Sequence, residues 1–129
     1  MPPTLSKHPV HLGLGATVVS EPAFTGIDWY EGYGERHADD GKEARLVSMH
    51  SFSESWDAWE MHPEGAELVV CTAGEITLVQ EIDGAEVRTT LGPGEYAINE
   101  PGVWHTADTA GATAVFITAG LGTQIRPRE

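Results

Sequence analysis

From residue 44 onward, the chain consists of short apolar runs rich in Val, Ile, Thr and aromatic residues, separated by glycine and proline turns. The predicted strands are Ala44–Met49, Trp56–His62, Glu67–Ala73, Ile76–Ile82, Val87–Leu91, Tyr96–Asn99, Trp104–Asp108 and Thr113–Ala119. The clearest turns are Pro63-Glu64-Gly65, Asp83-Gly84, Pro93-Gly94, Pro101-Gly102 and Ala110-Gly111. Strands of this length and spacing predict an all-β sandwich or closed barrel, because stacking or closure removes exposed sheet edges.

The local signals are strong at one hairpin and weak near the N-terminus. Asp83-Gly84 predicts a type I′ turn, since both central positions need a positive φ. A further strand is expected at Gly15–Ser20. The stretch Gly34–Ala44 is polar throughout and contains Asp39-Asp40-Gly41, so we expect a solvated loop there.

Composition limits the chain to one ordinary folded domain. It has 129 residues, 40% of them hydrophobic, and a net charge of −13, which would repel phosphate backbones and anionic lipids. No apolar run approaches the roughly 20 residues that span a bilayer. The single cysteine, Cys71, excludes an intramolecular disulfide and is expected inside a buried strand. We therefore expect a cytoplasmic protein that binds neither nucleic acid nor membrane.

Side chains able to bind a metal gather in Trp59-Glu60-Met61-His62, where strand alternation places Glu60 and His62 on one face. The following turn should return the chain as an antiparallel strand that brings Glu67 opposite His62. His105 lies far along the chain, so only a closed or folded-over sheet would bring it to the same place.

The spacing Glu60-x-His62-x4-Glu67-x6-Gly74, followed by Gly94-x5-Glu100-Pro101-Gly102-x2-His105, resembles the paired motifs of the cupin superfamily over residues 54 to 109. The sequence departs from those motifs at Glu54, Glu60, Glu100 and Thr109, and only the change at 60 affects a metal ligand. The resemblance implies a single double-stranded β-helix, or jelly-roll barrel. It also implies a ligand pocket in the barrel mouth and, in many members, one divalent metal at positions matching 60, 62, 67 and 105.

Glu60 can be read either as a metal ligand or as a residue beside the metal, and this leaves two metal hypotheses open. With Glu60 as a fourth ligand, the set of two imidazoles and two carboxylates suits Mn, Fe, Ni or Zn. Without it, His62, Glu67 and His105 form a two-His, one-carboxylate set of the kind that non-haem Fe(II) enzymes use. Glu60 then becomes a general base or a hydrogen-bond acceptor behind the ligands. The alternative is a metal-free barrel whose histidines are polar groups of a binding pocket.

We consider three functions for such a barrel. The first is a metal-dependent enzyme that acts on a small organic molecule by isomerase, lyase or dioxygenase chemistry; the second is a non-catalytic binding or sensor module, and the third is a structural or storage protein. Residues 46–122 are expected to form the barrel and 123–129 a C-terminal tail. Residues 1–45 should cover the barrel or form the interface of a homodimer, through Trp29, Tyr30 and Tyr33.

The remaining aromatic residues and histidines are expected to have ordinary roles. Trp56 shares strand parity with Glu60 and should pack in the core or line the pocket, whereas Trp59 and Trp104 should point away from it. Phe116 is expected in the core. His8, His11, His37 and His50 are not expected to be metal ligands.

Overall fold

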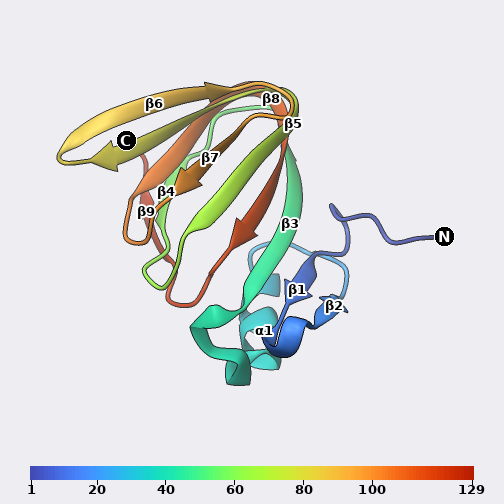
Figure 1. Cartoon of the computed structure of the whole chain (residues 1–129). Coiled ribbons are helices and arrows are strands. Elements are labelled where there is room, and N and C mark those ends of the chain that lie inside the picture. The colour runs from blue at the N-terminus through green and yellow to red at the C-terminus, as the bar shows by residue number, and fades with distance from the viewer.

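The computed structural model describes residues 1–129 and has nine strands, one α-helix and two 3-10 helices (Figure 1). The strands are β1 (Val10–Leu12), β2 (Val18–Ser20), β3 (Arg45–Phe52), β4 (Ala58–Met61), β5 (Glu67–Ile82), β6 (Ala85–Leu91), β7 (Tyr96–Asn99), β8 (His105–Thr118) and β9 (Gln124–Pro127). The helices are η1 (Leu14–Ala16), α1 (Trp29–Arg36) and η2 (Ala38–Glu43). No helix is long and apolar enough to cross a membrane.

Two long strands, β5 and β8, pass through both layers of the barrel. One layer runs β2-β1-β3, then the end of β8, the start of β5, and β7, as the antiparallel registers show. The other layer runs β9-β4, then the start of β8, the end of β5, and β6. This architecture is the double-stranded β-helix, so the jelly-roll expectation is confirmed.

β5 and β8 are each one continuous strand, although the sequence suggested two strands in each segment. The sequence pattern is interrupted because both strands bend where they pass from one layer to the other. The β5–β8 ladder has register shifts between Cys71 and Ala73 and between Glu75 and Thr77. At Gly74, where φ is +71°, a Cβ atom would collide with the carbonyl oxygen of Gly111. Only glycine lets the two backbones approach this closely in this conformation.

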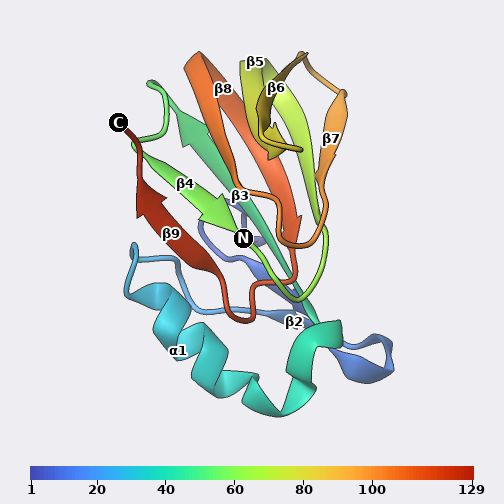
Figure 2. The same ribbon diagram turned by 90° about the vertical axis from the view of Figure 1, so that its left-hand side faces the viewer.

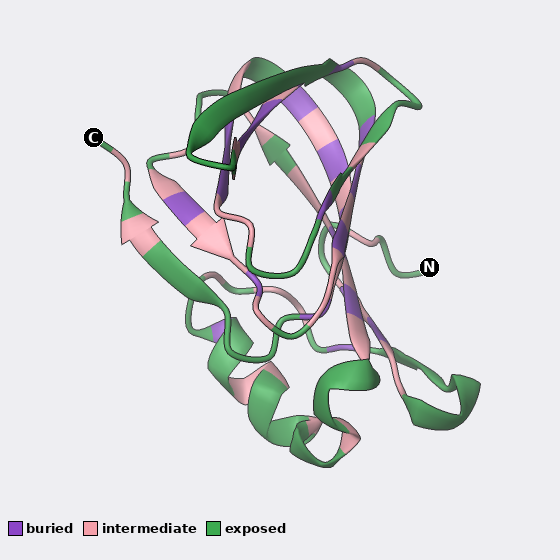
Figure 3. Cartoon of the chain, turned by 60° about the vertical axis from the view of Figure 1, so that its left-hand side comes forward, coloured by how far each residue is buried: buried purple, intermediate pink, exposed green.

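The apolar core fills one end of the barrel and leaves the other end to the cavity. The buried cluster is Val69, Cys71, Ile76, Leu91, Ala107, Ala112, Ala114 and Phe116. Buried residues recur along β5 and β8, while β2, β6 and most of α1 are exposed (Figure 3). The predictions that Cys71 and Phe116 lie in the core are confirmed.

The N-terminal residues form a cap that the sequence described incompletely. β1 extends the sheet beside β3, and α1 and η2 lie below the barrel in Figure 2. The prediction of a loop at Gly34–Ala44 is wrong, since α1 ends at Arg36 and η2 begins at Ala38. The α1 sequence carries Gly32 and Gly34 and has little intrinsic helical preference, so packing of the buried Trp29 stabilises the helix.

The two ends of the chain add strands that periodicity did not indicate. The segment 123–129, expected as a tail, contains β9, which pairs with β4 along its whole length. β1 was not expected, and the strand expected at Gly15–Ser20 is reduced to β2. The hairpin prediction at Asp83-Gly84 is confirmed, because both residues have a positive φ, +52° and +80°.

Candidate metal centre

Three strands bring the four expected ligands together at one end of the barrel. Glu60 lies in β4, His62 just after it, and Glu67 and His105 are the first residues of β5 and β8. Glu60 and His105 are register partners across the single β4–β8 bridge. Glu60, His62 and His105 each offer one ligand atom within 4.8 Å of the others.

Glu67 reaches His62 by a different route from the one expected. The prediction that β4 and β5 form an antiparallel pair is wrong, because β4 pairs with β8 and β9 while β5 pairs with β6, β7 and β8. The chain instead crosses from one layer to the other after His62. The Glu67 carboxylate then approaches His62 across the barrel interior.

The hydrogen bonds of the two imidazoles decide which nitrogen faces the centre. The Thr123 hydroxyl donates to the Gly120 carbonyl, so it accepts a hydrogen bond from Nδ1–H of His62 at 2.8 Å. His105 Nδ1 lies 3.2 Å from the Val103 carbonyl, which can only accept. In both rings, Nδ1 therefore keeps its proton and Nε2 is the nitrogen directed inward.

The two Nε2 atoms are separated from Glu67 by distances that suit a shared cation. His62 Nε2 lies 3.3 Å from Glu67 Oε2, and His105 Nε2 lies 3.3 Å from Glu67 Oε1. Both nitrogens are buried without a hydrogen-bond partner. Ligand atoms about 2.1 Å from one ion and about 90–110° apart lie about 3.0–3.4 Å from each other. The residues present therefore fit a divalent metal.

Glu67 is held as a carboxylate by four polar neighbours. Asn99 Nδ2 donates to Oε1 at 3.0 Å, and Thr118 Oγ1 donates to Oε2 at 2.6 Å. Gln80 in turn fixes the Asn99 side chain through a 2.8 Å hydrogen bond. Although burial opposes ionisation, the contacts with His105 and His62 hold the pKa of Glu67 well below its usual range. The buried Glu67 side chain is therefore negatively charged and able to bind a cation.

Glu60 stands farther from the histidines than Glu67 does. Its Oε1 lies 3.9 Å from His62 Nε2, and its side chain is 35% exposed toward the cavity. Burial and the neighbouring charge of Glu67 raise the pKa of Glu60, against the opposing effect of the two histidines. Burial opposes protonation of His105, but Glu67 raises the pKa of His105 overall. A metal at Nε2 would displace that proton.

The centre opens into a cavity of about 990 Å³, which the cap borders on one side. Tyr30 of α1 lines it, and burial together with the carboxylates of Glu60 and Glu67 raises the pKa of Tyr30 to about 12. Trp56 also lines the cavity and packs on Phe52 and Phe116, whereas Trp59 and Trp104 do not line it. The parity predictions for the three tryptophans are therefore confirmed.

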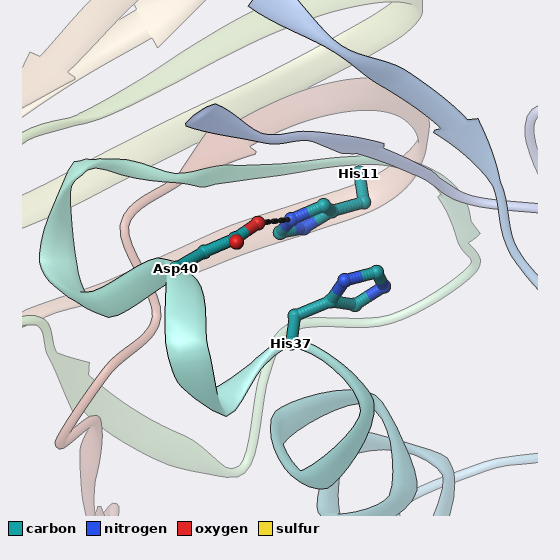
Figure 4. Close-up of side chains that lie close together, drawn as sticks. All are labelled: His11, His37 and Asp40. Carbon is teal, nitrogen blue, oxygen red and sulfur yellow. Dashed lines mark hydrogen bonds and ion pairs between the residues drawn. The ribbon is translucent and has the colours of Figure 1, made fainter. Parts of the chain in front are cut away.

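A second polar cluster in the cap was missed because its members lie far apart in sequence. His11 is 1% exposed, its Nε2 lies 2.6 Å from Asp40 Oδ2, and its ring stacks on His37 (Figure 4). Asp40, expected in a solvated loop, keeps 28% of its side chain exposed and also pairs with the buried His11. Because the Asp40 carboxylate accepts from Nε2–H, His11 Nδ1 accepts from the Tyr33 hydroxyl at 2.6 Å.

The cap cluster is complete without an ion. Both nitrogens of His11 have partners, and His37 Nε2 donates to the buried carboxylate of Glu21, which Arg36 also binds. The His11 and His37 rings lie parallel with centroids 3.6 Å apart, so their in-plane lone pairs do not converge on one point. We therefore assign this cluster to the anchoring of α1 and η2 on β1.

Several residues around the candidate metal centre carried no recognisable sequence signal. Thr123, Asn99 and Thr118 orient His62 and Glu67, yet each is an ordinary polar residue of a strand or turn. His50, which was not expected to be a metal ligand, also lines the cavity.

Comparison with known proteins agrees with the fold. Residues 53–119 match the family model described as a cupin domain. An oxalate oxidase in complex with the substrate analogue glycolate superposes with a TM-score of 0.54 at 14% identity, over 64% of this chain and 45% of that one. A conserved protein with a double-stranded β-helix domain from Klebsiella pneumoniae gives 0.53 at 22% identity, over 66% and 75%.

The chain therefore spans less than half of the oxalate oxidase chain that it resembles. At these identities, the likeness to both structures shows the fold alone. No curated protein matches the chain.

Proposed function

The chain belongs to the cupin family, and from this premise we propose that it is a metal-dependent enzyme acting on a small organic molecule in the barrel mouth. His62, Glu67 and His105 would hold one divalent metal, chosen among Mn, Fe, Ni and Zn. Two imidazoles and one carboxylate leave coordination positions free for substrate. Enzymes of different chemistry share this fold, so the proposal rests on the centre itself.

One observation carries the proposal. Two buried imidazoles have their Nδ1–H groups engaged and their Nε2 atoms unpartnered, and both Nε2 atoms lie 3.3 Å from the same carboxylate. A buried unpaired polar atom costs about 1–3 kcal/mol. Two of them at one point are explained by a cation that both bind.

The chain's own residues would handle binding and protons around that centre. A bound divalent metal would supply a Lewis acid that polarises an oxygen of the substrate. Glu60 borders the cavity, is more exposed than Glu67, and is set back from the histidines, so we assign it the proton acceptor role rather than that of a fourth ligand. Tyr30 stays a neutral phenol and offers a hydrogen bond from the cap.

An open coordination position is the property that separates an enzyme from a closed structural site. The protein is loaded with Fe(II) without oxygen, treated with nitric oxide, and examined by electron paramagnetic resonance. We expect a nitrosyl signal in the wild type and in Glu60→Gln, because Glu60 is not a ligand in this account. Bound iron that forms no nitrosyl adduct would contradict the proposal and favour a closed, non-catalytic site.

A further inference from the structure

Two buried amide side chains, Gln80 and Asn99, lie beside the candidate metal centre without lining its cavity. Gln80 is 8% exposed and Asn99 is 1% exposed. Neither borders the space where a substrate would lie, so any role in the centre must pass through a neighbouring side chain. A buried amide costs free energy unless it is hydrogen-bonded, and an apolar pair of similar shape is often as stable. Packing alone therefore does not explain why these two positions are polar.

Hydrogen bonds fix the direction in which both amides point. Gln80 Nε2 donates to the Ile98 carbonyl at 2.8 Å, and a backbone carbonyl can only accept. The same nitrogen donates its second hydrogen to Asn99 Oδ1, also at 2.8 Å. Because that oxygen faces Gln80, Asn99 presents its Nδ2 to Glu67, whose Oε1 accepts at 3.0 Å. Gln80, Asn99 and Glu67 thus form a relay in which every donor points toward the carboxylate.

The relay connects the two layers of the barrel at the metal centre. Gln80, near the end of β5, is the register partner of His105. Asn99, the last residue of β7, is the register partner of Glu67 at the start of β5. Each ligand thus has a neighbour across its own ladder, and the two neighbours hydrogen-bond to each other. This contact ties the layer that carries His105 to the layer that carries Glu67.

The orientation of the Glu67 carboxylate depends on the relay. Thr118 donates to Oε2 and Asn99 donates to Oε1, so the two donors hold both oxygens. With Thr118 alone, the carboxylate could rotate about its Cγ–Cδ bond while Oε2 stays bound. Oε1 would then move away from His105 Nε2, which lies 3.3 Å from it. A ligand that is already oriented loses less conformational freedom when it binds a metal.

We propose that Gln80 is a positioning residue of the candidate metal centre, because it holds Asn99 in the one orientation that fixes Glu67 toward His105. This inference rests on the proposed function, since Glu67 is a ligand of that centre. It requires that Gln80 affects metal affinity only through Asn99.

A double-mutant cycle tests whether Gln80 acts through Asn99. Gln80→Met and Asn99→Leu keep the approximate size of each side chain and remove its amide, and chelator competition gives the dissociation constant for Zn²⁺. Loss of a partner that orients a ligand weakens metal binding about 10- to 100-fold, so we expect Asn99→Leu within that range and Gln80→Met near its lower end. The double variant should match Asn99→Leu within about twofold, because Gln80 then has no amide to orient. Effects that multiply in the double variant would overturn the inference.

Gln124→Met is the matched control for the same chemical change. Gln124 is exposed in β9 and does not line the cavity, so we expect its replacement to leave the affinity for Zn²⁺ unchanged. Unchanged affinity in Gln80→Met, or an equal loss in Gln124→Met, would contradict the role of Gln80.

A measurement without metal tests the relay itself. In the chelator-treated wild type, nuclear magnetic resonance should show slow exchange of the Asn99 side-chain amide protons with water, because this amide is buried and hydrogen-bonded. We expect these protons to exchange about tenfold faster in Gln80→Met, the factor for about 1.4 kcal/mol of lost protection. Fast exchange in the wild type, or no change in Gln80→Met, would overturn the inference.

The two experiments separate this inference from the function on which it rests. A wild type that binds none of Mn, Fe, Ni and Zn but shows the exchange effect would contradict the metalloenzyme and support the positioning of Glu67 by Gln80. Tight metal binding without the exchange effect would leave the metalloenzyme intact and contradict the role of Gln80.

Discussion

Thr123→Val removes the hydroxyl group that orients His62 while keeping the size of the side chain. The Thr123 oxygen accepts from His62 Nδ1–H at 2.8 Å and donates to the Gly120 carbonyl at 2.8 Å. The His62 side chain is 6% exposed, so water does not readily replace the lost partner. We therefore expect weaker metal binding without loss of the fold.

The magnitude follows from the cost of the unpaired N–H. Leaving a buried donor unsatisfied costs about 1–3 kcal/mol, and the loss of a partner that orients a ligand weakens metal binding about 10- to 100-fold. The middle of that range, about 2 kcal/mol, corresponds to about 30-fold.

Competition with a chromophoric chelator measures the affinity for Zn²⁺ in the wild type, Thr123→Val and Thr77→Val. Thr77 is the control because its hydroxyl pairs with Thr90 on an exposed sheet surface. Affinity of Thr123→Val within about twofold of the wild type would refute the reasoning about the His62 tautomer. An equal loss in Thr77→Val would show that the effect is not specific to the centre.

Three further predictions concern stability. Glu60→Gln should stabilise the chelator-treated protein by less than about 1 kcal/mol, because it removes a carboxylate that burial and Glu67 disfavour and that solvent partly screens; calorimetry showing a lower melting temperature would contradict this. Gly74→Ala should cost more than about 3 kcal/mol in urea unfolding, and Gly84→Ala only about 1, since both need a positive φ but only Gly74 abuts backbone. Arg128 lowers the pKa of Asp108 to about 2, against burial and with help from Arg88. Asp108 should therefore contribute about 1 kcal/mol above pH 4 that is lost as the pH falls toward 2, and Asp108→Asn should remove this pH dependence of the urea midpoint.

The parts of the fold that follow local rules were predictable from the sequence. Asp83-Gly84 occupies two positions with positive φ, and the strand spacing correctly indicated an all-β sandwich or barrel. The jelly roll itself was implied by the resemblance to cupins. The four residues Glu60, His62, Glu67 and His105 do converge, as the cupin motifs implied. Motif spacing works here because Glu67 and His105 each begin a strand and His62 directly follows one, where the barrel geometry places them.

The parts that depend on distant partners were not predictable. Nothing in Trp59-Glu60-Met61-His62 indicates that β4 pairs with β8 and β9 rather than β5. The α1 helix forms because Trp29 is buried, not because its own residues favour a helix. His11 and Asp40 meet only after the cap has folded. The homodimer that the resemblance implies stays a prediction, testable by the mass of the protein in solution.

Metal content tests the central claim most directly. The wild type, His105→Ala and Glu60→Ala are reconstituted in turn with Mn, Fe, Ni and Zn and analysed by elemental mass spectrometry. His8→Ala is the control, since His8 bonds to the Glu21 carbonyl and does not line the cavity. The account predicts close to one equivalent of one of these metals in the wild type, His8→Ala and Glu60→Ala, and its loss in His105→Ala. No metal in the wild type, or equal metal in His105→Ala, would contradict it.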